Sequence, residues 1–584
     1  MTTPSEQGGS LLAIDVGEIN TRAVLFDVVE GRYRFLAFGT ARTTAQAPQN
    51  HIMEGVLRAI SRLEEITGRA LIGEDNRVIT PGSLDGSGVD VFITTMSAGP
   101  PLKVLVVGLL EDVSLASAKQ LVSTTYAQVI ETIGLNDGKK PEERLDIILS
   151  CRPDLIIIAG GTENGATNSV IRLVESVRLA CSLMPKEQRP EVLYTGNQAL
   201  LEEVENKLGS LTKLYKSPNV RPGLDVEQFS PAQARMAEIF RSFRISQIPG
   251  TSDLDEWSGN RLLPTSTAFG RIIQFLSKVY DPTKGVLGVD VGASATTIAS
   301  AFDGELTLGV FPEYGLGQGL SGLLDDVSLE EIQRWVPLEV GTDYIRDYIF
   351  NKTIYPASLP VTEEDLAIEL ALTRQAIRCS ISCASDGFPK KIGLSADGLL
   401  PWFEPIVATG SVLTQAPSYG HSLLTLLDAL QPTSITTVVL DQSNLTAPLG
   451  AAASIKPFIS VQVLESSAYL SLATVITPIS NARPGSPILR LRVTYESGDE
   501  TSFDIKQGTL EALPIPMGEA ARLRLQPLNR SDVGMGGPGR GGSVRVVGGI
   551  LGVVIDARGR PLLLPGDTGR RQALYKKWLW TLGG

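Results

Sequence analysis

The 584-residue chain contains only two histidines, His51 and His421. A Ser/His/Asp triad or a histidine-rich metal site is therefore nearly excluded by counting. Cysteine is also rare, and four scattered residues are too few for a disulfide scaffold, which is typical of a protein from a reducing compartment. These cysteines are Cys151, Cys181, Cys379 and Cys383.

Long hydrophobic runs are missing as well. The longest apolar stretches, such as Val104 to Leu110 and Leu155 to Ala159, have the length of a strand. A membrane-spanning helix needs roughly 18–20 apolar residues. The N-terminal sequence MTTPSEQGGS has no basic segment followed by an apolar one, so it is not a secretory signal and is predicted to be a flexible tail over residues 1–10. These absences predict a cytoplasmic protein without a membrane span.

The balance of charge limits the class of partner. The net charge is −12, which argues against a nucleic-acid binder by bulk electrostatics, while 43% apolar and 20% charged residues indicate a globular protein. The charge is uneven, because the segment from Arg522 to the end carries a net +8 and the rest therefore carries −20. This asymmetry predicts a basic end module that meets an acidic surface, either its own or a partner's.

An internal repeat is the most informative feature of the sequence. The segments LLAIDVGEINTRAVLFD from Leu11 and VLGVDVGASATTIASAF from Val286 align without gaps at an apolar-Asp-Val-Gly core. Two short apolar runs separated by a polar turn are typical of a β-hairpin. The repeat therefore predicts two similar lobes, each beginning with a strand that ends in Asp-Val-Gly.

The regions around the repeats differ in pattern. Strand–helix alternation from about Val89 to Val220, including a helix expected over Ser114 to Ile133, predicts an inserted parallel α/β subdomain. Beyond Ile459 short strand runs dominate, the first of them at Val461 to Leu464. The predicted organisation is a tail (1–10), a first lobe (11–88), an insert (89–250), a connecting helix and linker (251–284), a second lobe (285–458) and a β-rich basic domain (459–584).

The paired Asp-Val-Gly segments suit phosphate chemistry. A strand delivers Asp15 to the mouth of a cleft, and Gly17 lets the backbone amides approach an anion closely. The second copy offers Asp290, Gly292 and the hydroxyl residues Thr296 and Thr297. Two carboxylates that face one polyphosphate imply a divalent cation, and Mg²⁺ binds through one or two carboxylates plus phosphate oxygens. One Asp would hold the ion, and the other would orient an attacking water or hydroxyl.

Two further segments have both a functional and a plain structural interpretation. The strand from Ile406 runs into Thr409, Gly410 and Ser411, which allow a flat ring or a sugar to approach the backbone but also suit a simple strand-to-helix turn. The run of small residues from Leu449 to Ala453 predicts a helix with a very small face that packs tightly on another helix.

Together these segments resemble the actin, Hsp70 and sugar-kinase superfamily of ATPases. More narrowly, the chain from about Leu11 to Ile455 resembles the glutamate mutase accessory proteins of the MutL type, which are unrelated to the mismatch-repair protein of that name. This narrower resemblance rests on SAGPP at 97–101, VGL at 107–109, RPDLIIIAGGT at 152–162, YTGN at 194–197, NVRP at 219–222 and LPT at 263–265.

The resemblance implies a two-lobed actin-like ATPase with a duplicated ribonuclease H-like core. It implies Mg²⁺-ATP as the ligand, slow ATP hydrolysis, and a protein partner such as an adenosylcobalamin-dependent mutase, towards which the chain would act as a reactivating chaperone. The first phosphate loop would contain Asp15 and Gly17 with Thr21 and Arg22 beside it. The second would contain Asp290, Gly292, Thr296 and Thr297, and Gly410 and Ser411 would lie at the adenosine. Homo-oligomerisation is compatible with this assignment.

The loops depart from the family's pattern at several positions. Glu18 and Ile19 follow the first Gly, where small or hydroxyl residues are usual, and Ala293 and Ala295 replace Gly and Thr in the second loop. A carboxylate at 4 Å from a phosphate is repulsive by roughly 1–4 kcal/mol, depending on screening. Glu18 therefore points away, helps to hold the metal, or weakens nucleotide binding. The alternatives are a non-catalytic scaffold or filament protein that binds nucleotide weakly, and a small-molecule kinase of the same superfamily.

Overall fold

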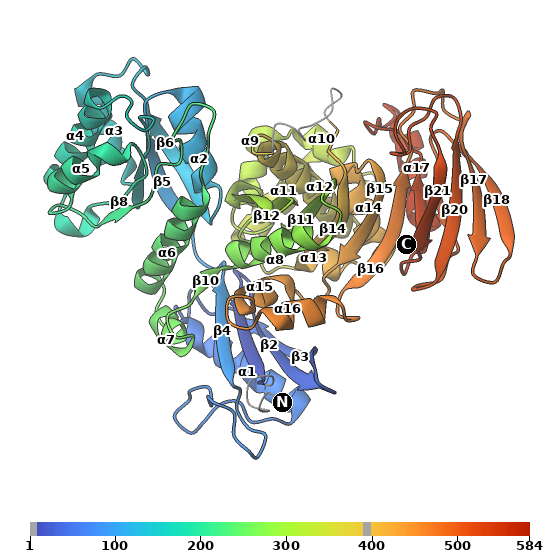
Figure 1. Cartoon of the computed structure of the whole chain (residues 1–584), viewed down its shortest axis with the longest axis horizontal. Helices are drawn as coiled ribbons and strands as arrows, with labels where there is room; N and C mark the ends of the chain where they lie inside the picture. Colours follow the sequence, from blue (N-terminus) through green and yellow to red (C-terminus); the bar gives the residue numbers. More distant parts are fainter. Residues whose placement is uncertain (1–8, 389–398) are drawn as a thin grey trace.

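The computed structural model describes residues 9–388 and 399–584, so most of the predicted tail lies outside the described residues. Four β-sheets organise this part of the chain (Figure 1). No helix among the described residues is long and apolar enough to span a bilayer.

The first lobe contains a five-stranded sheet in the order β10-β4-β1-β2-β3. The hairpin predicted at the first repeat is present, since β1 (Leu11–Val16) pairs antiparallel with β2 (Asn20–Val29), and β2 pairs with β3 (Arg32–Arg42). On the other side β4 (Val91–Met96) and β10 (Leu263–Pro264) run parallel to β1. Helix α1 (Ile52–Thr67) buries an apolar face against this sheet and ends at Gly68, whose φ is +68°. Strand β4, inside the range predicted for the insert, is therefore a strand of the first sheet.

The second lobe repeats this topology. Its strands β13-β12-β11-β14-β15 follow the same order, with an antiparallel β-meander and two parallel strands. The strands are β11 (Gly285–Val291), β12 (Thr296–Phe302), β13 (Glu305–Phe311), β14 (Phe403–Thr409) and β15 (Ser434–Leu440). The matched orders form a duplicated ribonuclease H-like core, and the predicted two-lobed actin-like fold is confirmed. The lobe's helices are α9 (Leu323–Asp326), α10 (Leu329–Gln333), α11 (Thr342–Ile354), α12 (Glu363–Ser385), α13 (Ser411–Thr414) and α14 (Tyr419–Leu430).

Two helices join the lobes. Helix α8 (Thr265–Val279) and helix α15 (Thr446–Ala452) pack on each other between the two sheets (Figure 1). A Cβ atom added at Gly450 would lie only 1.8 Å from the carbonyl oxygen of Ala268. The small helix face predicted at Leu449 to Ala453 therefore serves close helix–helix packing.

The inserted subdomain contains a parallel sheet in the order β6-β5-β7-β8-β9 and stands beside both lobes (Figure 1). The helix expected over Ser114 to Ile133 is wrong beyond Val122, because the chain turns there and the β-branched segment from Ala127 pairs with β5 as β6. The strands are β5 (Leu102–Val107), β6 (Ala127–Ile133), β7 (Leu155–Ile158), β8 (Glu191–Tyr194) and β9 (Leu214–Lys216). The helices are α2 (Ala116–Val122), α3 (Pro141–Cys151), α4 (Asn168–Leu183) and α5 (Leu201–Leu208), and α6 (Ser230–Gln247) and α7 (Thr251–Trp257) lead back to the first lobe.

The C-terminal part is built onto the second lobe. Strands β16 (Leu470–Thr477), β22 (Val553–Asp556) and β19 (Leu510–Leu513) extend the second lobe's sheet to eight strands. A separate sheet packs its apolar face on this extension, and its strands in order are β18 (Glu500–Lys506), β17 (Pro487–Tyr495), β20 (Ala520–Pro527) and β21 (Gly542–Val547). The strand expected at Val461 to Leu464 is instead the end of helix α16 (Pro457–Leu464). Pro457 begins that helix, and burial of Ile459 and Val463 at a spacing of four residues favours the helix over a strand.

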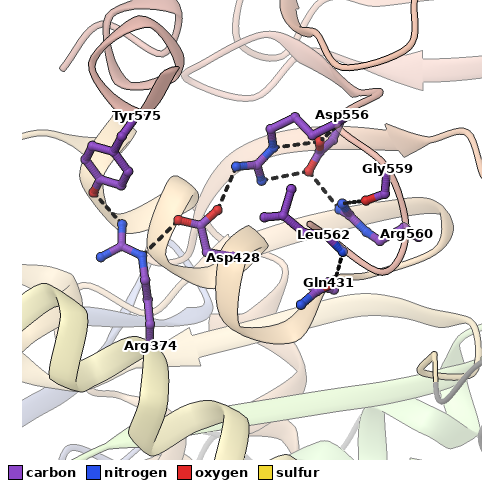
Figure 2. A network of polar contacts seen from close by, with 9 residues as sticks. Arg374, Asp428, Gln431, Asp556, Gly559, Arg560, Leu562 and Tyr575 are labelled. Atoms are coloured by element: carbon purple, nitrogen blue, oxygen red, sulfur yellow. Dashed lines mark hydrogen bonds and ion pairs between the residues drawn. The ribbon is translucent and has the colours of Figure 1, made fainter. Parts of the chain in front are cut away.

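A buried polar network fixes the C-terminal segment to the second lobe (Figure 2). Asp428 of α14 accepts hydrogen bonds from Arg374 of α12 at 2.8 Å and from Arg558 at 2.7 Å, and all three side chains are fully buried. Arg558 and Arg560 also bond Asp556. The hydroxyl of Tyr575, in helix α17 (Thr568–Thr581), contacts Arg374. Part of the predicted basic end therefore meets acidic groups of its own chain.

Candidate functional site

The first hairpin places Asp15 near the carboxyl end of β1, the central strand of the first sheet. Asp15 is opposite Arg22 across the hairpin and beside Thr95 of the parallel strand β4. Its Oδ1 accepts hydrogen bonds from the hydroxyls of Thr95 at 2.7 Å and Thr265 at 2.9 Å. The turn that follows is tight, because the amide of Gly17 donates to the carbonyl of Asn20 at 3.0 Å. Burial raises the pKa of Asp15, while the two hydroxyls and Arg22 act in the opposite direction.

The second hairpin repeats this geometry. Asp290 is opposite Thr297 across the hairpin and beside Thr409 of the parallel strand β14. The amide of Gly292 donates to the carbonyl of Ala295 at 3.0 Å, as Gly17 does in the first turn. Asp290, like Asp15, is a half-buried residue, and no hydrogen bond from the described residues ends on its carboxylate. Burial raises its pKa to about 7, with a further contribution from the charge of Asp15.

The charges of both carboxylates act on the guanidinium of Arg22. Arg22 has an exposed fraction of 8%, and burial lowers its pKa while Asp15, Asp441 and Asp290 all favour its charged form. Three carboxylates from both lobes therefore act on a single guanidinium. The Nη1 atom of Arg22 is buried and has no hydrogen-bond partner among the described residues.

Asp441 was not among the residues predicted for the site. It follows β15 and is fully buried, and its carboxylate accepts bonds from the amides of Leu445 and Thr446 at 2.9 and 2.8 Å and from the Thr446 hydroxyl at 2.6 Å. It thereby caps the start of α15. The signal for it in the sequence was the apolar run that ends at Asp441, a pattern shared with the strands that end at Asp15 and Asp290.

A cavity of about 230 Å³ lies where the two turns meet. Glu18 of the first turn and Ala293 and Ser294 of the second line it, together with residues of the insert and of the segment after β13. These other residues are Gly99, Pro100, Pro101, Gln128, Pro312, Glu313, Gln318, Gly319 and Gly322. The cavity therefore has walls from the first lobe, the second lobe and the insert.

Glu18 points toward the insert. Its carboxylate accepts a hydrogen bond from the amide of Gly99 at 3.0 Å and one from the side chain of Gln46 at 2.5 Å. Gly99 lies in the segment that leads from β4 into the insert. Arg244, on the helix by which the chain returns, is fully buried and donates to the carbonyls of Gly99 at 3.3 Å and Pro100 at 2.8 Å. Glu18 thus joins the first turn to the segment that enters the insert, and Arg244 joins that segment to the helix by which the chain returns.

The predicted threonines brace the turns. Thr21 is fully buried, and its hydroxyl lies 2.9 Å from that of Thr43, which donates to the carbonyl of Gly17 at 2.7 Å. Thr296 is fully buried and donates to the carbonyl of Tyr314 at 2.7 Å.

The predicted adenosine segment lies next to the second hairpin. Gly410 has a φ of +107°, and a Cβ atom there would lie 2.2 Å from the carbonyl oxygen of Val291. Thr409, the last residue of β14, pairs with Asp290, and Gly410 is the next residue along the chain. Ser411 is exposed at the start of α13.

The protein groups at this site suit a cation that a ligand also coordinates better than a metal held by protein groups alone. No group of three or more His, Cys, Asp or Glu side chains that could hold a metal occurs among residues 9–388 and 399–584. Asp290 has a carboxylate without hydrogen bonds, and Asp15 keeps Oδ2 free of any hydrogen bond from the described residues. One or two carboxylates plus phosphate oxygens are the set that Mg²⁺ uses. The residues therefore fit Mg²⁺ bound together with a phosphate.

Comparison with known proteins gave one family. The family model described as MutL protein matches residues 11–468. A search of curated proteins returned no match.

Several solved structures are similar to this chain at low identity. A nucleotide-free acetone carboxylase is 13% identical with a TM-score of 0.33, covering 86% of this chain and 81% of that chain. An ATP-dependent caprolactamase from Pseudomonas jessenii is 12% identical with a TM-score of 0.31, covering 85% and 81%. Component A of (R)-2-hydroxyglutaryl-CoA dehydratase from Acidaminococcus fermentans is 10% identical with a TM-score of 0.25, covering 76% and 96%.

Proposed function

Because the chain belongs to the MutL protein family, the one connected with glutamate mutase and not with mismatch repair, we propose that it is an actin-like ATPase that acts on a partner enzyme. ATP binds between the lobes, and its slow hydrolysis drives a hinge motion that remodels or reactivates the partner. The partner is an adenosylcobalamin-dependent mutase such as glutamate mutase.

One observation carries the ATPase part of this proposal. Two hairpins of matching geometry place Asp15 and Asp290 where both charges act on the guanidinium of Arg22, without a direct ion pair, and their turns line one cavity. A ligand in this cavity would meet the two turns, and its phosphates would extend beyond the lining residues to reach Asp15, Asp290 and Arg22, none of which lines the cavity. A metal-bound triphosphate has the matching charges.

The residues have distinct roles in this proposal. Asp15 and Asp290 would hold Mg²⁺, which neutralises charge on phosphate oxygens. Arg22 donates to a phosphate oxygen through its unpartnered Nη1. Asp290 would also orient a water molecule for attack and accept its proton. Gly410 and Ser411 border the adenosine.

Substitution of Asp290 tests the proposal directly. We expect Asp290→Asn to abolish Mg²⁺-dependent ATP hydrolysis while a fluorescent ATP analogue still binds. Asp303→Asn is the matched control, because Asp303 is an exposed carboxylate on the β12–β13 turn and should leave turnover unchanged. Unchanged turnover in Asp290→Asn would remove Asp290 from the mechanism.

Faster turnover in the presence of a cobalamin-dependent mutase is the expected sign of the partner.

A specific observation favours a second candidate function, that of a non-catalytic scaffold. Glu18 and Glu313 both line the cavity, and their carboxylates would oppose a polyphosphate. A ligand that binds the native state must stabilise it. The absence of a thermal shift at millimolar ATP and Mg²⁺ would therefore favour the scaffold over the ATPase.

A further inference from the structure

The outer face of the C-terminal sheet is lined with arginine. Strands β17 (Pro487–Tyr495), β20 (Ala520–Pro527) and β21 (Gly542–Val547) alternate between side chains buried against the eight-stranded sheet and exposed ones. The exposed positions carry Arg490, Arg492, Arg522, Arg524 and Arg545.

Only part of this charge is paired within the chain. On the neighbouring strand β18 (Glu500–Lys506), Asp504 pairs with Arg490 at 2.8 Å and Glu500 with Arg492 at 3.8 Å. Arg522, Arg524 and Arg545 make no ion pair with any described residue.

The strand register also places arginines directly opposite each other on neighbouring strands. Arg524 lies directly opposite Arg492, and Arg522 lies directly opposite Arg545. Like charges at directly opposed positions destabilise a sheet. The part of this face formed by β20 and β21 therefore carries a cluster of positive charge that no ion pair with the described residues neutralises.

We propose that the unpaired arginine face, formed by Arg522, Arg524 and Arg545, docks an acidic protein surface. Residues two apart on a strand are about 6.8 Å apart, and neighbouring strands are about 4.8 Å apart. Carboxylates at i and i+4 of a helix have a similar spacing. Arg forms bidentate bonds with such carboxylates, which gives geometric selectivity as well as attraction.

The surroundings favour a protein over a nucleic acid. Asp504 and Glu500 are on the same face. The outward positions of the four strands, all within the described residues, carry no aromatic side chain on which a base could stack, because Tyr495 and Phe503 pack against the inner cluster.

The face is remote from the candidate site. Strands β17, β18, β20 and β21 lie at one end of the molecule, and the insert lies at the other (Figure 1). A partner docked on the arginines leaves the cavity between the hairpins accessible. The inference therefore goes beyond the proposed function and does not depend on ATP binding.

A labelled peptide of twelve glutamates, titrated into the full chain, tests the inference. We expect binding at 50 mM NaCl that weakens at least tenfold at 300 mM, because exposed charges are screened. The double variant Arg522→Glu with Arg524→Glu should lose at least tenfold in affinity. The control exchanges a paired couple, Arg490→Asp with Asp504→Arg, and should bind within twofold of the parent.

Thermal unfolding separates docking from folding in the same variants. Glu at positions 522 and 524 would oppose Arg545 and Arg492, so the midpoint should hold or rise while peptide binding falls. Equal peptide affinity in the double variant, or no binding by the parent at 50 mM NaCl, would overturn the inference. Tighter binding of a twelve-nucleotide oligothymidylate than of the peptide would overturn it in favour of nucleic acid.

Discussion

At the scale of the residue, the protonation of Asp290 should be visible in the stability of the protein. Its pKa in the folded chain is about 7, above the ordinary value of 3.8. The folded state therefore binds this proton more tightly, and the resulting stabilisation is complete below about pH 4 and is lost as the pH rises to 7. In thermal unfolding without nucleotide, we expect the midpoint of Asp290→Asn to rise relative to that of the parent as the pH increases over this range. A constant difference in midpoint from pH 4.5 to pH 8 would contradict this.

Glu18 offers a second test at this scale. Its carboxylate bonds Gly99 and lines the cavity, and Gln at this position keeps an oxygen acceptor while removing the charge. Repulsion of about 1 kcal/mol, the value for unit charges 4 Å apart in water, corresponds to roughly fivefold in affinity. We expect Glu18→Gln to bind an ATP analogue about fivefold more tightly in a fluorescence titration. Glu305→Gln, an exposed site on β13, is the control, and equal affinities would show that Glu18 does not act on the ligand.

At the scale of the element, the contact between α8 and α15 is sensitive to a single methyl group. A Cβ at Gly450 would overlap the backbone of Ala268, so Gly450→Ala must push the helices apart. We expect a loss of about 1–3 kcal/mol in the free energy of unfolding in urea. Gly341→Ala is the matched control, because no atom lies within 4 Å of the added carbon. A near-neutral effect at Gly450 would mean that the helices can separate freely.

How well the sequence predicts structure differs from one helix or strand to another. The hairpins and the small face near Gly450 are local patterns, so they could be read from short segments. The strand expected at Val461 and the helix expected to Ile133 failed because pairing and burial against distant segments decide between the two structures. The same limit applies to the candidate site, since the hydroxyls of Thr95 and Thr265 reach Asp15 from 80 and 250 residues away.

At the scale of the whole molecule, the buried network around Asp428 holds the C-terminal segment on the second lobe (Figure 2). Asn at this position would leave two fully buried guanidiniums, those of Arg374 and Arg558, without their shared carboxylate. Breaking a buried ion pair by removing one partner typically costs about 3–5 kcal/mol. We expect Asp428→Asn to lose stability of this order in denaturant unfolding, and to expose the chain beyond β16 to limited proteolysis.

The control for this prediction uses the exposed pair on the C-terminal sheet. Asp504→Asn removes one partner of Arg490, whose side chain is 56% exposed, so water can replace the lost contact and unfolding should change little. If Asp428→Asn behaved like Asp504→Asn, the network would be dispensable, and the apolar packing of Tyr575 and Trp578 alone would hold α17 on the second lobe. If proteolysis instead began in the insert, the C-terminal segment would be anchored independently of Asp428.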